Sequence, residues 1–209
     1  MPRVSRQQAT FNRKAIVENA ARLFRERGFR NIPLSEVMSS SGLTVGGFYG
    51  HFESREALTN EACSHAFKQA ILFWRQLIDE APDKRTARYL IISDYLSKER
   101  VQINHNTCPV VAFSGEVSQE EHDSVINATY SRGLADLIAI YMEALDDACS
   151  PEALREKALT EYSVMIGALT LARAARSTEL SEEILKNAKS TLGIYGKQVN
   201  SKQGIVPTQ

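Results

Sequence analysis

Apolar residues recur at helical spacing along almost the whole chain, and this periodicity limits the possible folds more than any other feature. Between residues 11 and 27, for example, Ile16, Ala20, Leu23 and Phe24 fall on one face of a helix. No run of convincing length alternates apolar and polar residues as a half-buried strand would. The sequence therefore predicts an all-α fold.

Proline, glycine and capping residues divide this pattern into separate helices. Ser54 and the Ser150-Pro151 step are typical helix starts, as is the Ser118-x-x-Glu121 capping box, which predicts the beginning of a long helix. Together these signals predict helices over residues 11–27, 33–41, 45–51, 55–78, 86–96, about 151–177 and 181–195, with a short one that opens at Cys108-Pro109.

Composition and missing motifs narrow the class of protein. A hydrophobic fraction of 43% is that of a folded soluble protein, and three cysteines without paired spacing or an apolar signal segment indicate a reducing cytoplasm. The most apolar charge-free stretch, between Glu161 and Arg173, is eleven residues long, well short of the ~20 residues that a bilayer requires. We find no Gly-rich phosphate loop and no nucleophile elbow, and His105, Cys108 and His122 lack further metal ligands. We therefore expect no enzyme, no cofactor, no metal site and no membrane association.

Charge is distributed unevenly, although the chain has 25 basic and 25 acidic residues. Residues 1–60 hold nine Lys or Arg and five Asp or Glu, a net charge of +4, which leaves −4 for residues 61–209. A basic head on an acidic body fits a small module that meets phosphate and a larger module with another role. Near the start, Arg3, Arg6, Arg13 and Lys14 predict an arm that follows a nucleic-acid backbone or enters a minor groove, with a merely solvated tail as the alternative.

Residues 33–55 have the layout of a helix-turn-helix, in which the second helix enters the DNA major groove. Gly42 supplies the tight turn. Gly46 and Gly47 lie inside the second helix and cost roughly 2 kcal/mol of helix propensity, for which close approach to a ligand is one explanation. Tyr49 and His51 can donate hydrogen bonds to phosphate oxygens, although both can also simply complete a small three-helix core.

The run GLTVGGFYGHF at 42–52, followed by SREAL at 54–58, resembles the recognition helix and the start of the fourth helix of TetR-type transcriptional regulators. Leu23-Phe24-x-x-x-Gly28-Phe29 is similar to the end of their first helix. The resemblance covers residues 11–60 and is architectural beyond them. It implies a homodimer on double-stranded DNA, with the two heads in successive major grooves of a palindromic operator. It also implies that a small-molecule effector, bound in the body, releases the DNA.

Carried over by position, the resemblance assigns phosphate contacts to Thr44, Tyr49, His51 and Arg55, and base contacts to Val45, Gly46 and Gly47. Many family members have Lys or another polar residue where this chain has Val45, so we expect base readout to use contact with thymine methyl groups. The expected division is a DNA-binding domain at 1–53, a ligand-binding and dimerisation domain at 54–200, and a flexible tail at 201–209.

Several predicted helices of the body contribute aromatic or apolar residues that could line a ligand cavity. The candidates are Phe67, Ile71, Trp74, Tyr89, Phe113 and Tyr130. Such a cavity would suit an apolar or aromatic compound, whereas the alternative for each residue is ordinary core packing. A DNA-binding protein with a filled body and no small-molecule inducer also remains open.

The last two predicted helices carry a stripe that is typical of helix pairing. It consists of Leu154, Ala158, Tyr162, Met165, Leu169 and Ala172, with Ile184, Ala188, Leu192 and Tyr195 from the final helix. Two such surfaces would form a four-helix dimer interface, as the resemblance implies, and the alternative is that the stripe belongs to the core of one chain.

Cys108 is a further candidate in the ligand-binding region, because it precedes Pro109 at the expected start of a helix. Unpaired amides and the helix dipole favour a nucleophilic thiolate at such a position. The hypothesis is a sensor of oxidants or electrophiles that acts through Cys108. The alternative is a small buried residue that caps the helix.

Overall fold

The computed structural model describes residues 5–102, 107–145 and 150–194, which form helices and turns without a β-strand. The helices are α1 (Arg6–Arg27), α2 (Leu34–Ser40), the 3-10 helix η1 (Val45–Gly50), α3 (Arg55–Glu80), α4 (Lys84–Tyr95), α5 (Lys98–Gln102), α6 (Pro109–Val117), α7 (Val125–Glu143), α8 (Pro151–Ala174) and α9 (Glu179–Thr191). The all-α prediction is confirmed. Within these ranges no helix is long and apolar enough to cross a membrane. Arg3, His105, Cys149, Tyr195 and the predicted tail lie outside the described residues.

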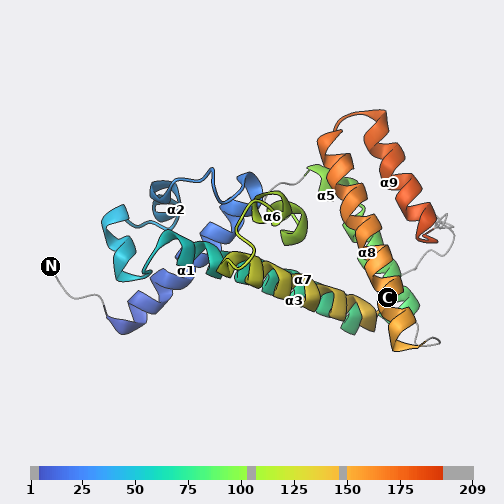
Figure 1. The fold of residues 1–209 in the computed structure, drawn as a ribbon, viewed down its shortest axis with the longest axis horizontal. Coiled ribbons are helices and arrows are strands. Elements are labelled where there is room, and N and C mark those ends of the chain that lie inside the picture. Colours follow the sequence, from blue (N-terminus) through green and yellow to red (C-terminus); the bar gives the residue numbers. More distant parts are fainter. Residues whose placement is uncertain (1–4, 103–106, 146–149, 195–209) are drawn as a thin grey trace, which may run out of the picture.

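The molecule is elongated, with a head at one end and a helical hairpin at the other (Figure 1). α1, α2 and η1 form the head, and α8 and α9 form the hairpin. α3 runs out of the head and lies beside α7 in the most extensive helix pair of the fold. A continuous apolar core connects the two ends, since α3 buries Leu58 near its start and Trp74 near its end.

Helix starts follow the capping residues in most places. The hydroxyls of Ser54 and Ser150 accept hydrogen bonds from the amides of Ala57 and Ala153, as predicted. The predicted helix start at Ser118 is wrong, because α7 begins at Val125 after a Ser124 cap. The Ser118 hydroxyl donates instead to the Gly115 carbonyl at the end of α6, so Ser118 terminates one helix rather than starting the next.

A buried charged network joins four helices of the body. Arg88 of α4 donates from Nε and Nη2 to the two carboxylate oxygens of Glu161 in α8, each at 2.8 Å. The Tyr141 hydroxyl of α7 donates to the same carboxylate at 2.6 Å, and Arg88 also reaches the Leu192 carbonyl just beyond α9 at 2.7 Å. Buried charges are tolerated only when they are paired and hydrogen-bonded in this way. The network therefore fixes how α4, α7, α8 and the end of α9 meet.

Candidate nucleic-acid interface and body cavity

The chain reverses between α2 and η1 in a turn that requires glycine. Gly42 has a φ of +71°, a left-handed conformation that residues with a side chain rarely adopt. The Leu43 amide donates to the Met38 carbonyl at 2.9 Å and closes the turn. The Asn19 side chain of α1 donates to the Ser41 hydroxyl at 3.3 Å, which holds the turn against α1. The predicted helix-turn-helix layout is therefore present.

η1 is a 3-10 helix, whereas the sequence predicted a short α-helix. Its hydrogen bonds span three residues, from the Gly47 amide to the Thr44 carbonyl at 3.0 Å and from the His51 amide to the Phe48 carbonyl at 2.8 Å. Glycines at 46, 47 and 50 give a six-residue segment little α-helical propensity, so the tighter form prevails. Thr44 precedes the helix as expected, but its side chain makes no cap hydrogen bond.

The segment 44–50, which we call the recognition segment, faces outward except for Phe48. Phe48 is fully buried and stacks on Phe52, with 5.5 Å between ring centroids. Tyr49, by contrast, is 75% exposed. A Cβ atom added to Gly46 or Gly47 would meet no atom within 4 Å, so the packing of the head does not require either glycine. Buried Phe48 thus anchors a strip of small, exposed residues.

Most of the predicted DNA contacts come together on this strip. Thr44, Val45, Gly46, Gly47 and Tyr49 are all exposed on the recognition segment. His51 follows directly and is half-buried.

Arg55 differs from the prediction, because its guanidinium is turned into the protein. Its Nη2 atom donates to the carbonyls of Phe29 and Ile32, both at 2.6 Å. These carbonyls lie in the connection between α1 and α2, so Arg55 ties the start of α3 to that connection. We therefore remove Arg55 from the proposed phosphate contacts.

The predicted N-terminal arm is also corrected. Ser5 caps α1 with its side chain, so the helix begins at Arg6 rather than at residue 11 and includes Arg6 together with Arg13 and Lys14. Arg13 forms a bidentate ion pair with Glu61 of α3. Its Cζ atom also lies over the Phe52 ring, 4.6 Å from the ring centroid. Arg13 therefore links α1 to α3.

Comparison with known proteins points to this same part of the chain. Residues 16–62 match the family model described as bacterial regulatory proteins, tetR family. The chain belongs to the TetR family. The repressor NemR of Escherichia coli (strain K12) is 24% identical over 191 residues, which are 86% of this chain and 93% of that protein. YerO, an uncharacterized HTH-type regulator of Bacillus subtilis (strain 168), is 38% identical over 53 residues, 25% of this chain and only 18% of that protein.

A solved structure has the same fold over most of the chain. The crystal structure of the reduced form of E. coli NemR superposes with a TM-score of 0.71 at 21% sequence identity, covering 86% of this chain and 96% of that one. As a member of the TetR family, the chain is a DNA-binding transcriptional regulator and not an enzyme.

The body of this TetR-family chain contains a cavity of about 220 Å³, which we call the body cavity. Two of the predicted ligand-binding residues, Trp74 and Cys108, line it. Its wall is drawn from α1, α3, α4, α5, α6, α7 and α8 and from the residues just before α6: Arg25, Gln69, Ala70, Phe73, Trp74, Tyr95, Arg100, Thr107, Cys108, Pro109, Leu137 and Leu169.

The other predicted ligand-binding residues do not line the body cavity. Phe67 and Ile71 line an outer groove between α3 and α7, and Tyr89 lines another beside Gly193. Phe113 is buried against Phe29, at 6.2 Å between ring centroids, and therefore packs the core. The Tyr130 hydroxyl donates to the Val110 carbonyl at 3.2 Å and its ring meets Phe67 edge-on.

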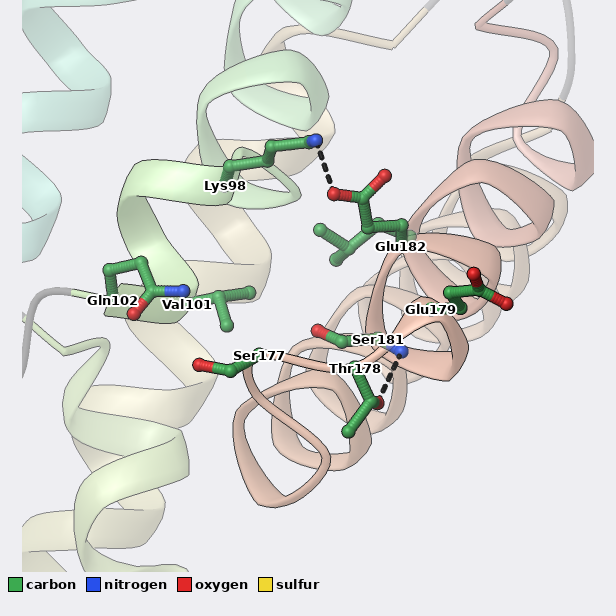
Figure 2. A pocket seen from close by; sticks show the side chains of 9 residues that line it. Lys98, Val101, Gln102, Ser177, Thr178, Glu179, Ser181 and Glu182 are labelled. Atoms are coloured by element: carbon green, nitrogen blue, oxygen red, sulfur yellow. Dashed lines mark hydrogen bonds and ion pairs between the residues drawn. The ribbon is translucent and has the colours of Figure 1, made fainter.

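A further groove lies where α5 meets the turn between α8 and α9 (Figure 2). Lys98 pairs with Glu182 across it, and the Thr178 hydroxyl caps α9 at its edge. Most of the labelled side chains are polar, and the two interactions drawn between them are Lys98–Glu182 and Thr178–Ser181. None of the predicted site residues lines this groove.

The predicted helix-pairing stripe is largely core of a single chain. Ala158, Tyr162, Met165, Leu169 and Ala172 are buried, and Tyr162 meets Trp74 at 5.5 Å between ring centroids. The opposite side of α8 is the exposed one. Between residues 158 and 172 it presents no charged side chain, because the one charged residue there, Glu161, is buried.

α6 connects the body cavity to the head, a role that sequence reasoning missed. Cys108 and Pro109 at its start line the cavity. Near its end, the Glu116 carboxylate accepts hydrogen bonds from the amides of Phe29 and Arg30 at 2.8 and 2.9 Å. Gly28 has a φ of +83°, and a Cβ there would lie 2.8 Å from the Glu116 carboxylate. The Leu-Phe-x-x-x-Gly-Phe pattern marked this glycine, but only the fold shows what occupies the space beside it.

Proposed function

We propose that this protein is a transcriptional repressor that binds a palindromic operator as a homodimer and is released by a small molecule in the body cavity. The observation that carries the proposal is the recognition segment, in which small and exposed residues follow a glycine turn and are anchored by buried Phe48. A protein surface of this shape lets its backbone approach base edges in a major groove.

The residues of the recognition segment, together with His51 that follows it, divide by chemistry. Val45, Gly46 and Gly47 face the bases, with the Val45 methyl groups suited to thymine methyls. Thr44, Tyr49 and His51 donate to phosphate oxygens and set the register of the head on the duplex. The proposed division remains residues 1–53 as the DNA-binding head and residues 54–200 as the effector-binding and dimerisation body.

Selection of genomic fragments by the purified protein, followed by footprinting, tests the DNA-binding part. We expect a palindrome whose half-sites lie about one helical turn apart, ~34–36 Å, because two identical heads bind symmetrically. Retention of every fragment with equal affinity, or of none at low ionic strength, would contradict the proposal.

The outward face of α8 is the proposed dimer surface. Leu159 and Leu171 are exposed on it, Ile166 and Gly167 are half-buried, and Leu180 of α9 is exposed beside the hairpin. The other exposed side chains of this face are the uncharged Thr160, Ser163 and Thr170, and a long helix face without charge suits a helical dimer interface. A Cβ at Gly167 would meet no atom within 4 Å, so this glycine leaves room for a neighbouring helix.

Gly167→Arg tests this surface, with Gly115→Arg on α6 as its matched control. Both glycines lie in helices and have open space around the Cβ position, so the two substitutions should affect the stability of the monomer equally. In sedimentation equilibrium we expect a dimer for wild type and for Gly115→Arg, and a monomer for Gly167→Arg. A dimer in all three proteins would place the interface elsewhere.

The position of the body cavity suits an effector that acts on the head. Arg25 belongs to α1, a helix of the head, and yet lines the cavity. Pro109 lines it from α6, whose Glu116 holds the α1–α2 connection. An effector in the cavity therefore contacts two elements that position the recognition segment, and its binding would move the paired heads out of register with the half-sites. The presence of a cavity among the body helices also favours this function over a DNA-binding protein whose body is packed throughout.

A second candidate function, electrophile sensing, is favoured by the place of Cys108. Its Sγ lies on the cavity wall, 3.7 Å from the Tyr162 hydroxyl. Cys63, by contrast, is buried, and burial raises its pKa to about 12, which makes it a poor nucleophile.

Iodoacetamide tests the sensing function. The Cys108 sulfur attacks the CH₂ carbon, an S–C bond forms, iodide leaves and the thiol proton passes to solvent. We expect release of operator DNA from wild type and from Cys63→Ser, but not from Cys108→Ser. Equal release from all three proteins would exclude Cys108 as the sensor.

A further inference from the structure

The helix-turn-helix offers none of the side chains that commonly read purine edges. Arginine and lysine recognise guanine in the major groove, and asparagine and glutamine recognise adenine. Residues 33–55 contain no lysine, asparagine or glutamine, and their one arginine, Arg55, donates to two backbone carbonyls of the α1–α2 connection. Glutamate recognises cytosine, but Glu36 is paired with Arg27, and Glu53 lies beyond the recognition segment.

Two polar side chains of α1 that lie beside this motif are also held by the protein. The Arg13 Nε atom donates to the His51 carbonyl at 3.3 Å, and its guanidinium is paired with Glu61. The Asn19 side chain donates to the Ser41 hydroxyl at 3.3 Å. Neither side chain can reach a base without giving up a contact that holds the head together.

Val45 is the one side chain on the base-facing part of the recognition segment, residues 45–47. Gly46 and Gly47 follow it, and a Cβ atom at either position would meet no atom within 4 Å. Val45 is 44% exposed, so its methyl groups project beside bare backbone. A methyl group forms no hydrogen bond and therefore recognises an apolar group on a base edge. In the major groove of unmodified DNA that group is the C5-methyl of thymine.

The same methyl group occurs on a modified base. 5-Methylcytosine has it at the same ring position as thymine, and both pyrimidines present it in the major groove. The two bases differ at C4, where thymine has an oxygen acceptor and cytosine has an amino donor. A protein needs a polar side chain at this point to tell them apart, and residues 45–47 provide none.

We propose that Val45 selects operator DNA by a pyrimidine C5-methyl group, without side-chain hydrogen bonds to purines, so that 5-methylcytosine replaces thymine at the contacted position. Methylation of a cytosine there would strengthen binding, because it adds the contact that unmodified cytosine lacks. This inference rests on the proposed function in one respect, that the recognition segment lies in the major groove. It adds the chemical group that is read and names Val45 as the residue that determines specificity.

Four versions of the selected operator test the proposal. Each thymine of the half-sites is replaced in turn, symmetrically, by uracil, cytosine or 5-methylcytosine, and affinity for the full-length protein is measured by fluorescence anisotropy. At the position that Val45 contacts, we expect thymine and 5-methylcytosine to bind alike. Uracil and cytosine should bind about fourfold more weakly per half-site, the usual contribution of one buried methyl group. Equal binding of thymine and uracil at every position, or of 5-methylcytosine and cytosine, overturns the proposal.

Val45→Ala assigns the effect to its residue. Without the valine methyl groups, all four operator versions should bind with the same affinity, close to that of wild type on the uracil version. Val125→Ala is the matched control, because Val125 is also exposed, at 68%, but lies on α7 outside the head. The control should keep the wild-type preference, and neither change should alter the unfolding curve. A preference for methylated pyrimidines that survives in Val45→Ala overturns the proposal.

7-Deazaguanine and 7-deazaadenine test the missing purine contacts, because they lack the N7 acceptor that arginine, lysine, asparagine and glutamine use. We expect each replacement to change affinity by less than about twofold, whereas a loss of about tenfold or more at any position would overturn the proposal. An operator that is bound without regard to the methyl group leaves the proposed function standing. Failure to select any operator contradicts the proposed function itself.

Discussion

The head and the body of this protein build their functional surfaces in opposite ways. The recognition segment is one continuous run, residues 44–50, and its working residues are those that the fold leaves exposed. The body cavity is assembled from seven helices, and half of its twelve described lining residues are buried in the fold. A sequence can therefore display the first kind of site directly, whereas the second exists only after the chain has folded.

The two regions also differ in what holds them together. Stacked Phe48 and Phe52 anchor the recognition segment, and their contribution is non-directional burial of apolar surface. The body depends in addition on the Arg88–Glu161 pair, which is specific in direction and costly to break. Substitutions on the recognition segment should thus change binding with little effect on stability, and substitutions in the body should do the reverse.

Among the substitutions that test this difference between head and body, Glu161→Ala should have the largest effect on the free energy of unfolding. It leaves Arg88 and the Tyr141 hydroxyl without their shared acceptor, so we expect a loss of about 3–5 kcal/mol in the free energy of unfolding, measured by urea denaturation. Glu143→Ala is a matched control, because Glu143 is also paired with an arginine, Arg75 of α3, but is 47% exposed against 10% for the Glu161 side chain. The control should lose at most about 1 kcal/mol. Similar losses in both variants would show that burial of the pair does not matter.

Much of the fold could be predicted because its signals are local. Helical periodicity and the caps at Ser54 and Ser150 depend on residues a few positions apart, and those predictions agree with the structure. Ser118 misled the prediction because a serine that closes one helix resembles a serine that opens the next. The 3-10 form of η1 reflects a balance of small energies over six residues, which a pattern of apolar positions does not resolve.

The site was less predictable wherever the deciding partner is distant or is a backbone atom. Arg55 bonds two carbonyls, and no side-chain pattern marks a carbonyl as an acceptor. The stripe through Tyr162 has the spacing of a dimer seam and of a core face alike, so only the packing of Trp74 against it decides between them. The sequence leaves Phe113 open between a cavity wall and the core, because it shows the aromatic side chain but not its contact with Phe29.

Two glycine-to-alanine changes sharpen the contrast at intermediate size. In the body, a Cβ at Gly133 would lie 2.3 Å from the Phe67 ring, so Gly133→Ala should lower the free energy of unfolding by about 1–3 kcal/mol.

In the head, the Cβ position of Gly46 is open, and Gly46→Ala should leave stability unchanged or raise it by up to about 1 kcal/mol. Operator affinity, measured by fluorescence anisotropy, should nevertheless fall at least about tenfold for Gly46→Ala, because the methyl group holds the backbone away from the bases. Wild-type affinity in this variant would mean that the DNA does not approach Gly46.

Tyr49→Phe is the smallest expected change and the one that distinguishes positioning from sequence readout. The Tyr49 side chain is 75% exposed, so loss of its hydroxyl should not alter the unfolding curve. Operator affinity should fall by about 1 kcal/mol, the usual contribution of one hydrogen bond, and by the same factor on operator and on unrelated duplexes, because a phosphate contact carries no sequence information. Val45→Thr supplies the complementary result, since a change at a base-facing residue should reorder the preferred sequences. If Tyr49→Phe reorders those preferences while total affinity stays constant, its hydroxyl contacts a base, and the recognition segment then reads DNA along a longer stretch than Val45 to Gly47.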